Sequence, residues 1–96
     1  MIEYIENVIR ATAGENLCLI AKVTDALGNN LEACSFCLFS DENKLFMISG
    51  IRSQEHGVWE FYVPANATAN LKGRHWYAVC DENDTSLCFK NPIYFM

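Results

Sequence analysis

The segment TANLKGRHWYAV, residues 68–79, places a leucine, a glycine and a tyrosine at fixed offsets, as Leu71, Gly73 and Tyr77. The residues before the glycine, from Pro64 onward, are mostly small or polar and are typical of a connection. The residues after it are mostly aromatic or apolar and are typical of a strand. The segment therefore predicts a connection that passes through a glycine break into a strand that carries Tyr77.

Short strands are predicted on both sides of this segment. In LCLIAKVTD (17–25) the odd-numbered positions from 17 to 23 are apolar, which is the period-two pattern of a half-buried strand. In GVWEFYVP (57–64) the same period places Trp59, Phe61 and Val63 on one face. A first strand is expected within 2–12, although that stretch also permits a short helix. Further strands are predicted over 33–40, 44–50, 75–81 and 86–96.

Turn-forming segments separate these strands, and no stretch shows a sustained helical period. Asp, Asn and Gly gather in DALGNN (25–30) and DENDT (81–85), as in the turns of β proteins. Ninety-six residues fit one domain, and 51% hydrophobic residues suffice for one core. We therefore expect an all-β chain, folded as a single domain over 1–96.

The spacing around Tyr77 favours one kind of all-β fold. In immunoglobulin-like sandwiches a tyrosine near the start of strand F folds its hydroxyl back onto the corner that precedes it. Leu71 would fill the core, Gly73 would supply the break, and the hydroxyl of Tyr77 would bond to backbone in 70–74. The prediction is one immunoglobulin-like β-sandwich of about seven to eight antiparallel strands, with a helical turn in the connection capped by Thr68 or Asn66. The alternative is that Tyr77 is one more buried aromatic residue.

Charge excludes two classes of partner. The net charge is −5, and the seven lysines and arginines are scattered along the sequence. Nucleic acid and anionic membrane surfaces both require a basic face, so neither is expected. No apolar run is long enough to span a bilayer, and the first residues lack the basic start of a signal peptide. Synthesis in a cytoplasm is therefore expected.

The five cysteines are expected to be reduced and free of metal, since no secretion signal is present. Antibody-type domains pair a cysteine on strand F with one on strand B, and the tyrosine lies two residues before the first of these. Here Tyr77 and Cys80 are three residues apart and Cys18 opposes the apolar face of its strand, so that disulfide is not expected. A four-sulfur zinc site is a weaker alternative, because Cys34 and Cys37 would point to opposite faces of a strand. Its remaining ligands would be Cys80 and Cys88.

No catalytic constellation is present, and no cofactor is expected. The two histidines, His56 and His75, stand apart from any nucleophile pattern, and no phosphate-binding glycine loop occurs. The acidic loops 25–32 and 81–84 are expected to meet at one end of the sandwich. Their oxygens leave calcium binding open, beside the simpler interpretation of a solvated turn.

The C-terminal segment NPIYFM (91–96) predicts a docking surface. On a strand, Ile93 and Phe95 face one way and Tyr94 and Met96 the other, so one pair fills the core and the other stays outside. Pro92 cannot donate a ladder hydrogen bond, which suits an edge strand. The candidate docking residues are therefore Pro92, Tyr94 and Met96. The alternative is that both pairs are covered within the monomer.

The order of segments resembles small sandwich domains of tailed-bacteriophage structural proteins. These segments are AGEN (13–16), TDALGNNLE (24–32), GVWEFYVPANATANLKGRHWYAV (57–79) and PIYF (92–95). The resemblance covers most of 12–96 and is to N-terminal domains of baseplate upper proteins and to capsid decoration and head-fibre-base proteins. It implies a virion component without enzymatic activity. Five cysteines and an end at the last strand favour a free-standing accessory subunit.

Two functions are therefore expected, and neither is enzymatic. The first is a structural accessory that docks on a capsid or tail through other virion proteins, possible self-association included. The second is a ligand-binding module that recognises a host glycan or surface protein through aromatic residues such as Trp59 or Trp76.

Overall fold

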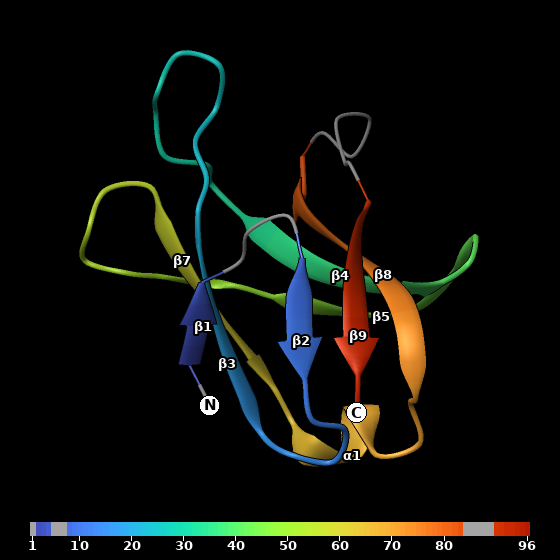
Figure 1. Ribbon diagram of the computed structural model, residues 1–96. Helices are drawn as coiled ribbons and strands as arrows, with labels where there is room; N and C mark the ends of the chain where they lie inside the picture. The colour runs from blue at the N-terminus through green and yellow to red at the C-terminus, as the bar shows by residue number, and fades with distance from the viewer. Residues whose placement is uncertain (1, 5–7, 84–89) are drawn as a thin grey trace.

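The computed structural model describes residues 2–4, 8–83 and 90–96, and these form two β-sheets (Figure 1). The four-stranded sheet has the order β1 (Ile2–Tyr4), β3 (Leu17–Lys22), β7 (Val58–Val63), β6 (Ile51–Arg52). The five-stranded sheet has the order β2 (Ile9–Ala11), β9 (Asn91–Phe95), β8 (Gly73–Asp81), β4 (Cys34–Ser40), β5 (Asn43–Ser49). One helical turn, α1 (Ala65–Thr68), joins β7 to β8. The all-β class predicted from the sequence is confirmed.

The stretch 2–12 holds two strands that belong to different sheets. β1 pairs with β3 and β2 pairs with β9, and both pairs are parallel. The expectation of antiparallel strands throughout is therefore wrong at these two places. The physical reason is that a period of two shows which residues share a face but not which strand, or which direction, is paired.

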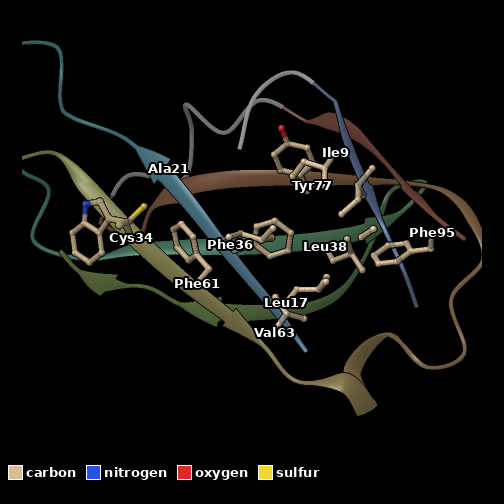
Figure 2. Packing of buried hydrophobic residues seen from close by; sticks show 14 of the residues in the cluster. Ile9, Leu17, Ala21, Cys34, Phe36, Leu38, Phe61, Val63, Tyr77 and Phe95 are labelled. Carbon is tan, nitrogen blue, oxygen red and sulfur yellow. The ribbon is translucent and has the colours of Figure 1, made fainter. Parts of the chain in front are cut away.

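The hydrophobic core lies between the two sheets (Figure 2). Phe36 on β4 is central, with its ring 5.7 Å from that of Tyr77 and 6.1 Å from that of Phe61, centroid to centroid. The predicted inward face of β7 is confirmed, since Trp59, Phe61 and Val63 are all buried. The core thus takes alternate residues from strands of both sheets.

The connection before β8 is partly as predicted. Leu71 packs against the core, Gly73 has a φ of +79° where β8 begins, and Tyr77 is buried. The helical turn is confirmed, but its N-cap residue is Pro64, and the amide of Ala65 donates to Oδ1 of Asn16 and not to Thr68 or Asn66. Thr68 is instead buried in the last position of the turn, where its hydroxyl accepts a hydrogen bond from the amide of Gly14 at 3.1 Å.

The hydroxyl of Tyr77 points away from the other labelled core residues in Figure 2. A bond from this hydroxyl to backbone in 70–74 stays a prediction. No helix in the described ranges has the length and apolar character that crossing a membrane requires.

Candidate functional site

β9 presents the predicted docking residues on the outer face of the five-stranded sheet. Ile93 and Phe95 are buried in the core, whereas Tyr94 is 36% exposed and Met96 is 72% exposed. The alternative in which both pairs are covered is therefore wrong for the isolated chain. β9 is not an edge strand, however, because β2 pairs with it. Pro92 is accommodated because the pairing with β2 begins only at Ile93.

A row of three large side chains crosses this face at Tyr94. Arg10 on β2 and Arg74 on β8 both stand opposite Tyr94 in the strand register. Both arginines are exposed, and the residues on either side of Arg10 are buried. Because directly opposed residues share a face of a sheet, the tyrosine is flanked by a guanidinium group on each side.

A second, more aromatic row lies beside the first. Pro92 pairs with Trp76, Trp76 with Phe39, and Phe39 with Lys44, so the row crosses β9, β8, β4 and β5. The guanidinium carbon of Arg74 lies 5.3 Å from the ring centroid of Trp76. The Nζ atom of Lys90 lies over the ring of Phe39, 4.4 Å from the ring centroid. Cations on ring faces hold these side chains in place.

Beyond the second row, the side chains on β8 and β4 are small, and the outer face has a hollow there. Ala78, Cys37 and Met47 stand opposite one another on β8, β4 and β5. Cys37 and Ala78 are buried although they point away from the core. A pocket of about 430 Å³ opens here. It is lined by Ser35, Cys37, Phe39, Lys44, Met47, Cys80 and Glu82.

A carboxylate closes the far end of the pocket. Ser35 and Ser49 both donate from their hydroxyls to Oε1 of Glu82, the second over 2.9 Å. These hydrogen bonds, that from Ser35 first, hold the pKa of Glu82 below its ordinary value. The pocket therefore runs from the cation Lys44 to an ionised Glu82 across an apolar floor.

We call the cations and aromatic rings of the first two rows, together with Lys90, the aromatic–cationic face. It gathers four of the seven basic residues of a chain with net charge −5. Within the described ranges no carboxylate forms an ion pair with any of the four. The predicted scatter of basic residues is thus true of the sequence but not of the folded chain. The members of the face are Arg10, Phe39, Lys44, Arg74, Trp76, Lys90, Pro92 and Tyr94.

Five of these residues, Lys90 among them, were not singled out by sequence reasoning. A signal for one existed, because Arg74 shares the period of two with Trp76 and so must share its face. No signal existed for Arg10, Lys44 or Phe39. Their places depend on which strands pair, and the sequence period does not carry that information.

The two cysteines of β4 are poor candidates for reactive thiols. Cys34 belongs to the core and Cys37 to the outer face, so the prediction that they point to opposite faces of the strand is confirmed. Two of the four sulfurs considered for a zinc site therefore lie on opposite sides of the sheet. Burial, with the nearby charge of Asp81, raises the pKa of Cys34 to about 12. Burial also raises the pKa of Cys37. Thiols that stay protonated are poor nucleophiles and poor metal ligands.

One prediction about the cysteines is wrong. Cys18, Cys34 and Cys37 are free thiols, but Cys80 is disulfide-bonded. The strand faces and the spacing from Tyr77 argued only against a disulfide between Cys18 and Cys80, and Cys18 is indeed free. They did not exclude a disulfide between Cys80 and another cysteine. Cys88 lies outside the described residues.

The two acidic loops meet as predicted. The side-chain amide of Asn83 donates to Oε2 of Glu32 over 3.4 Å, and the amide of Glu82 donates to the carbonyl of Ala33. Oδ1 of Asp25 already accepts the amides of Leu27 and Asn29, and the backbone bond of Asn29 is the main cause that lowers the pKa of Asp25. In the ranges that the structure describes, no three His, Cys, Asp or Glu side chains are grouped as metal ligands.

Of the remaining candidates, Trp59, His56 and His75 lie away from this face. Trp59 is only 3% exposed, so the expectation that it contacts a ligand is wrong, whereas Trp76 is half-buried on the outer face. Trp59 is buried because its odd-numbered position points inward with Phe61. His75 is buried edge-on against Phe95, and His56 contacts the carbonyl of Gly28.

Comparisons of the chain with models of protein families, with curated proteins and with solved structures find no match. The features that bear on function are therefore those of the outer face.

Proposed function

We propose that the chain is a non-enzymatic docking domain with an immunoglobulin-like β-sandwich fold. The strand order supports this fold. β1-β3-β7-β6 corresponds to the order A-B-E-D of such domains, and β9-β8-β4-β5 corresponds to G-F-C-C′. In that correspondence β8 is strand F, the strand on which a corner tyrosine is expected, and Tyr77 lies on it.

The observation that carries the docking role is the aromatic–cationic face. Arginine and aromatic side chains are enriched where proteins bind one another, because they combine large contact area with directed polar groups. Here they occupy adjacent rows of a sheet, with a pocket beside them. A polypeptide partner suits such a face better than a chemical reaction does, since burial raises the pKa of Cys37, the described free thiol that lines the pocket.

We further propose that the assembly is a bacteriophage virion, in which the chain is an accessory subunit of the capsid or tail. The resemblance of 12–96 to sandwich domains of phage structural proteins supports this assignment. The partners would be other virion proteins, with self-association as a variant, and synthesis would take place in the host cytoplasm. Neither nucleic acid nor membrane is a partner in this proposal.

Incorporation into particles tests the docking role. A variant with Tyr94→Ser and Met96→Lys alters the exposed side chains of the C-terminal segment and leaves Ile93 and Phe95 in the core. We expect it to keep its melting temperature and to lose most of its occupancy in purified particles, measured by quantitative mass spectrometry.

The matched control changes the opposite sheet. Ile51 and Tyr62 are exposed on the outer face of the four-stranded sheet, so Ile51→Lys with Tyr62→Ser makes the same chemical change there. We expect the control to be incorporated normally. If the first variant is stable and reaches wild-type occupancy, the docking role of this face is wrong.

A second candidate function is recognition of a host glycan or surface protein. The pocket of about 430 Å³ and the half-buried Trp76 favour it. In that case the isolated domain would bind its ligand saturably, and Trp76→Ala would abolish binding without affecting occupancy in particles.

A further inference from the structure

We propose that the occupant of the aromatic–cationic face is an extended acidic segment of a partner protein, with an apolar side chain that enters the pocket. This inference rests on the proposed docking role and adds the chemistry of the partner. Four kinds of observation carry it: charge, spacing, the floor of the pocket and the carboxylate at its end.

Charge selects an acidic partner. Arg10, Lys44, Arg74 and Lys90 face one way, and no described carboxylate forms an ion pair with them. The other three basic residues are shared among the remaining surfaces of a chain with twelve acidic residues. A basic area on an acidic chain steers negatively charged partners to one place and repels them elsewhere.

Spacing favours an extended segment. Arg10 and Arg74 lie one strand on either side of Tyr94, so their α carbons are about 10 Å apart at a strand separation of about 4.8 Å. Lys44 lies two strands beyond β8, about 10 Å further in the next row. An extended chain advances about 3.3 Å per residue and turns alternate side chains to the same face, so acidic residues two or four positions apart, about 7 or 13 Å along the chain, come within reach of these long basic side chains.

The pocket supplies the apolar part of the contact. Cys37 and Met47 line it, and the side chain of Cys37 and that of Ala78, which stands opposite Cys37 on β8, are both small. A leucine-sized or phenylalanine-sized side chain inserted there would exclude water beside Lys44. Salt bridges are stronger where water is excluded, so the anchor and the charges act together.

The carboxylate of Glu82 argues against a polynucleotide. It lines the pocket and is held ionised by Ser35 and Ser49, so a phosphate in the pocket would meet a negative charge. A peptide can instead donate a backbone amide to it. A dense polyanion is also repelled by the net charge of −5, whereas a short acidic segment contacts only the basic area.

Selection from a displayed library of random twelve-residue peptides tests the inference on the full chain. We expect enriched peptides with net negative charge, acidic residues two or four positions apart and an apolar residue among them. For a synthetic peptide of the enriched sequence, Arg10→Gln with Arg74→Gln should weaken binding about tenfold or more by fluorescence anisotropy. Lys22→Gln with Lys72→Gln removes the same charge from two exposed residues that are not members of the face, and this variant should bind as the unmodified chain does.

Three outcomes overturn the inference. They are enrichment of peptides without net negative charge, equal binding by the two double variants, and tighter binding of a twenty-nucleotide oligothymidylate than of the peptide. Particle occupancy separates this failure from failure of the docking role. If the Arg10/Arg74 variant loses its occupancy in particles but no acidic peptide is enriched, the docking role is supported and the proposal of an acidic partner is wrong. If acidic peptides bind but that variant keeps full occupancy, the docking role is wrong.

Discussion

Gly50 is the single residue by which the chain passes from β5 in one sheet to β6 in the other. Its amide donates to the carbonyl of Cys34 over 2.7 Å. A β carbon at this position would lie 2.7 Å from the ring of Phe61 and 3.0 Å from that carbonyl oxygen. Real β carbons do not approach other atoms so closely, so the crossing requires a residue without a side chain.

We therefore expect Gly50→Ala to lower the free energy of unfolding by about 1–3 kcal/mol, measured by urea denaturation. Gly28→Asn is the control, because a β carbon at Gly28 meets no atom within 4 Å and asparagine tolerates its φ of +83°. Equal stability of the two variants would show that Phe61 yields to the added methyl group.

Thr68 joins two connections that are distant in sequence. Its buried hydroxyl accepts from the amide of Gly14, so the turn before β3 is tied to the end of α1. Thr68→Val keeps the shape but leaves that amide without its acceptor, and we expect a loss of about 1–2 kcal/mol. Hydrogen exchange at the Gly14 amide gives the specific measurement. Protection should fall in Thr68→Val and persist in Thr68→Ser, and unchanged protection in the valine variant would refute the link.

At the scale of elements, Glu82 connects the ends of three strands. It follows β8 and receives the hydroxyls of Ser35 on β4 and Ser49 on β5. Since the folded chain lowers the pKa of Glu82, the stabilisation is present above the unfolded pKa and is lost as the pH falls through the folded pKa.

We expect the melting temperature of the unmodified chain to fall more steeply than that of Glu82→Gln between about pH 5 and pH 3. Glu15→Gln, at an exposed turn position, should behave like the unmodified chain. Parallel curves for the unmodified chain and Glu82→Gln would mean that the serine hydroxyls do not favour the ionised form.

The sequence predicted which face of each strand is buried better than it predicted which strands pair with one another. The alternation that buries Leu17 and Leu19 or Phe61 and Val63 needs only the period of a strand, and the structure confirms it. The division of 2–12 between two sheets was not predictable in this way. Three-residue strands are too short to show a period, and their pairing is decided by partners at the far end of the chain.

At the scale of the whole molecule, the docking residues were predicted only along β9, and Trp76 was predicted separately as a ligand contact. Pro92 and Tyr94 were identified because they are neighbours in sequence. Their partners Arg10 and Trp76 come from β2 and β8, and packing of the whole chain decides that these strands adjoin. Net charge was similarly a poor guide, because it gives a sum over the surface and no account of how charges are distributed.

The parallel pairing of β2 with β9 has a mechanical consequence (Figure 1). A pull on Val8 and Met96 in opposite directions slides these strands along each other and loads their hydrogen bonds together. Among these are the bonds that join Met96 to Ala11 and Ala13. A pull on Ala33 and Ile51 would instead open β4 and β5 bond by bond, because that pair is antiparallel. Single-molecule force spectroscopy should therefore record a higher rupture force for the first geometry, and equal forces would exclude a load-bearing β2–β9 pair. A domain held at Val8 and Met96 would then resist tension best along the line of β2 and β9.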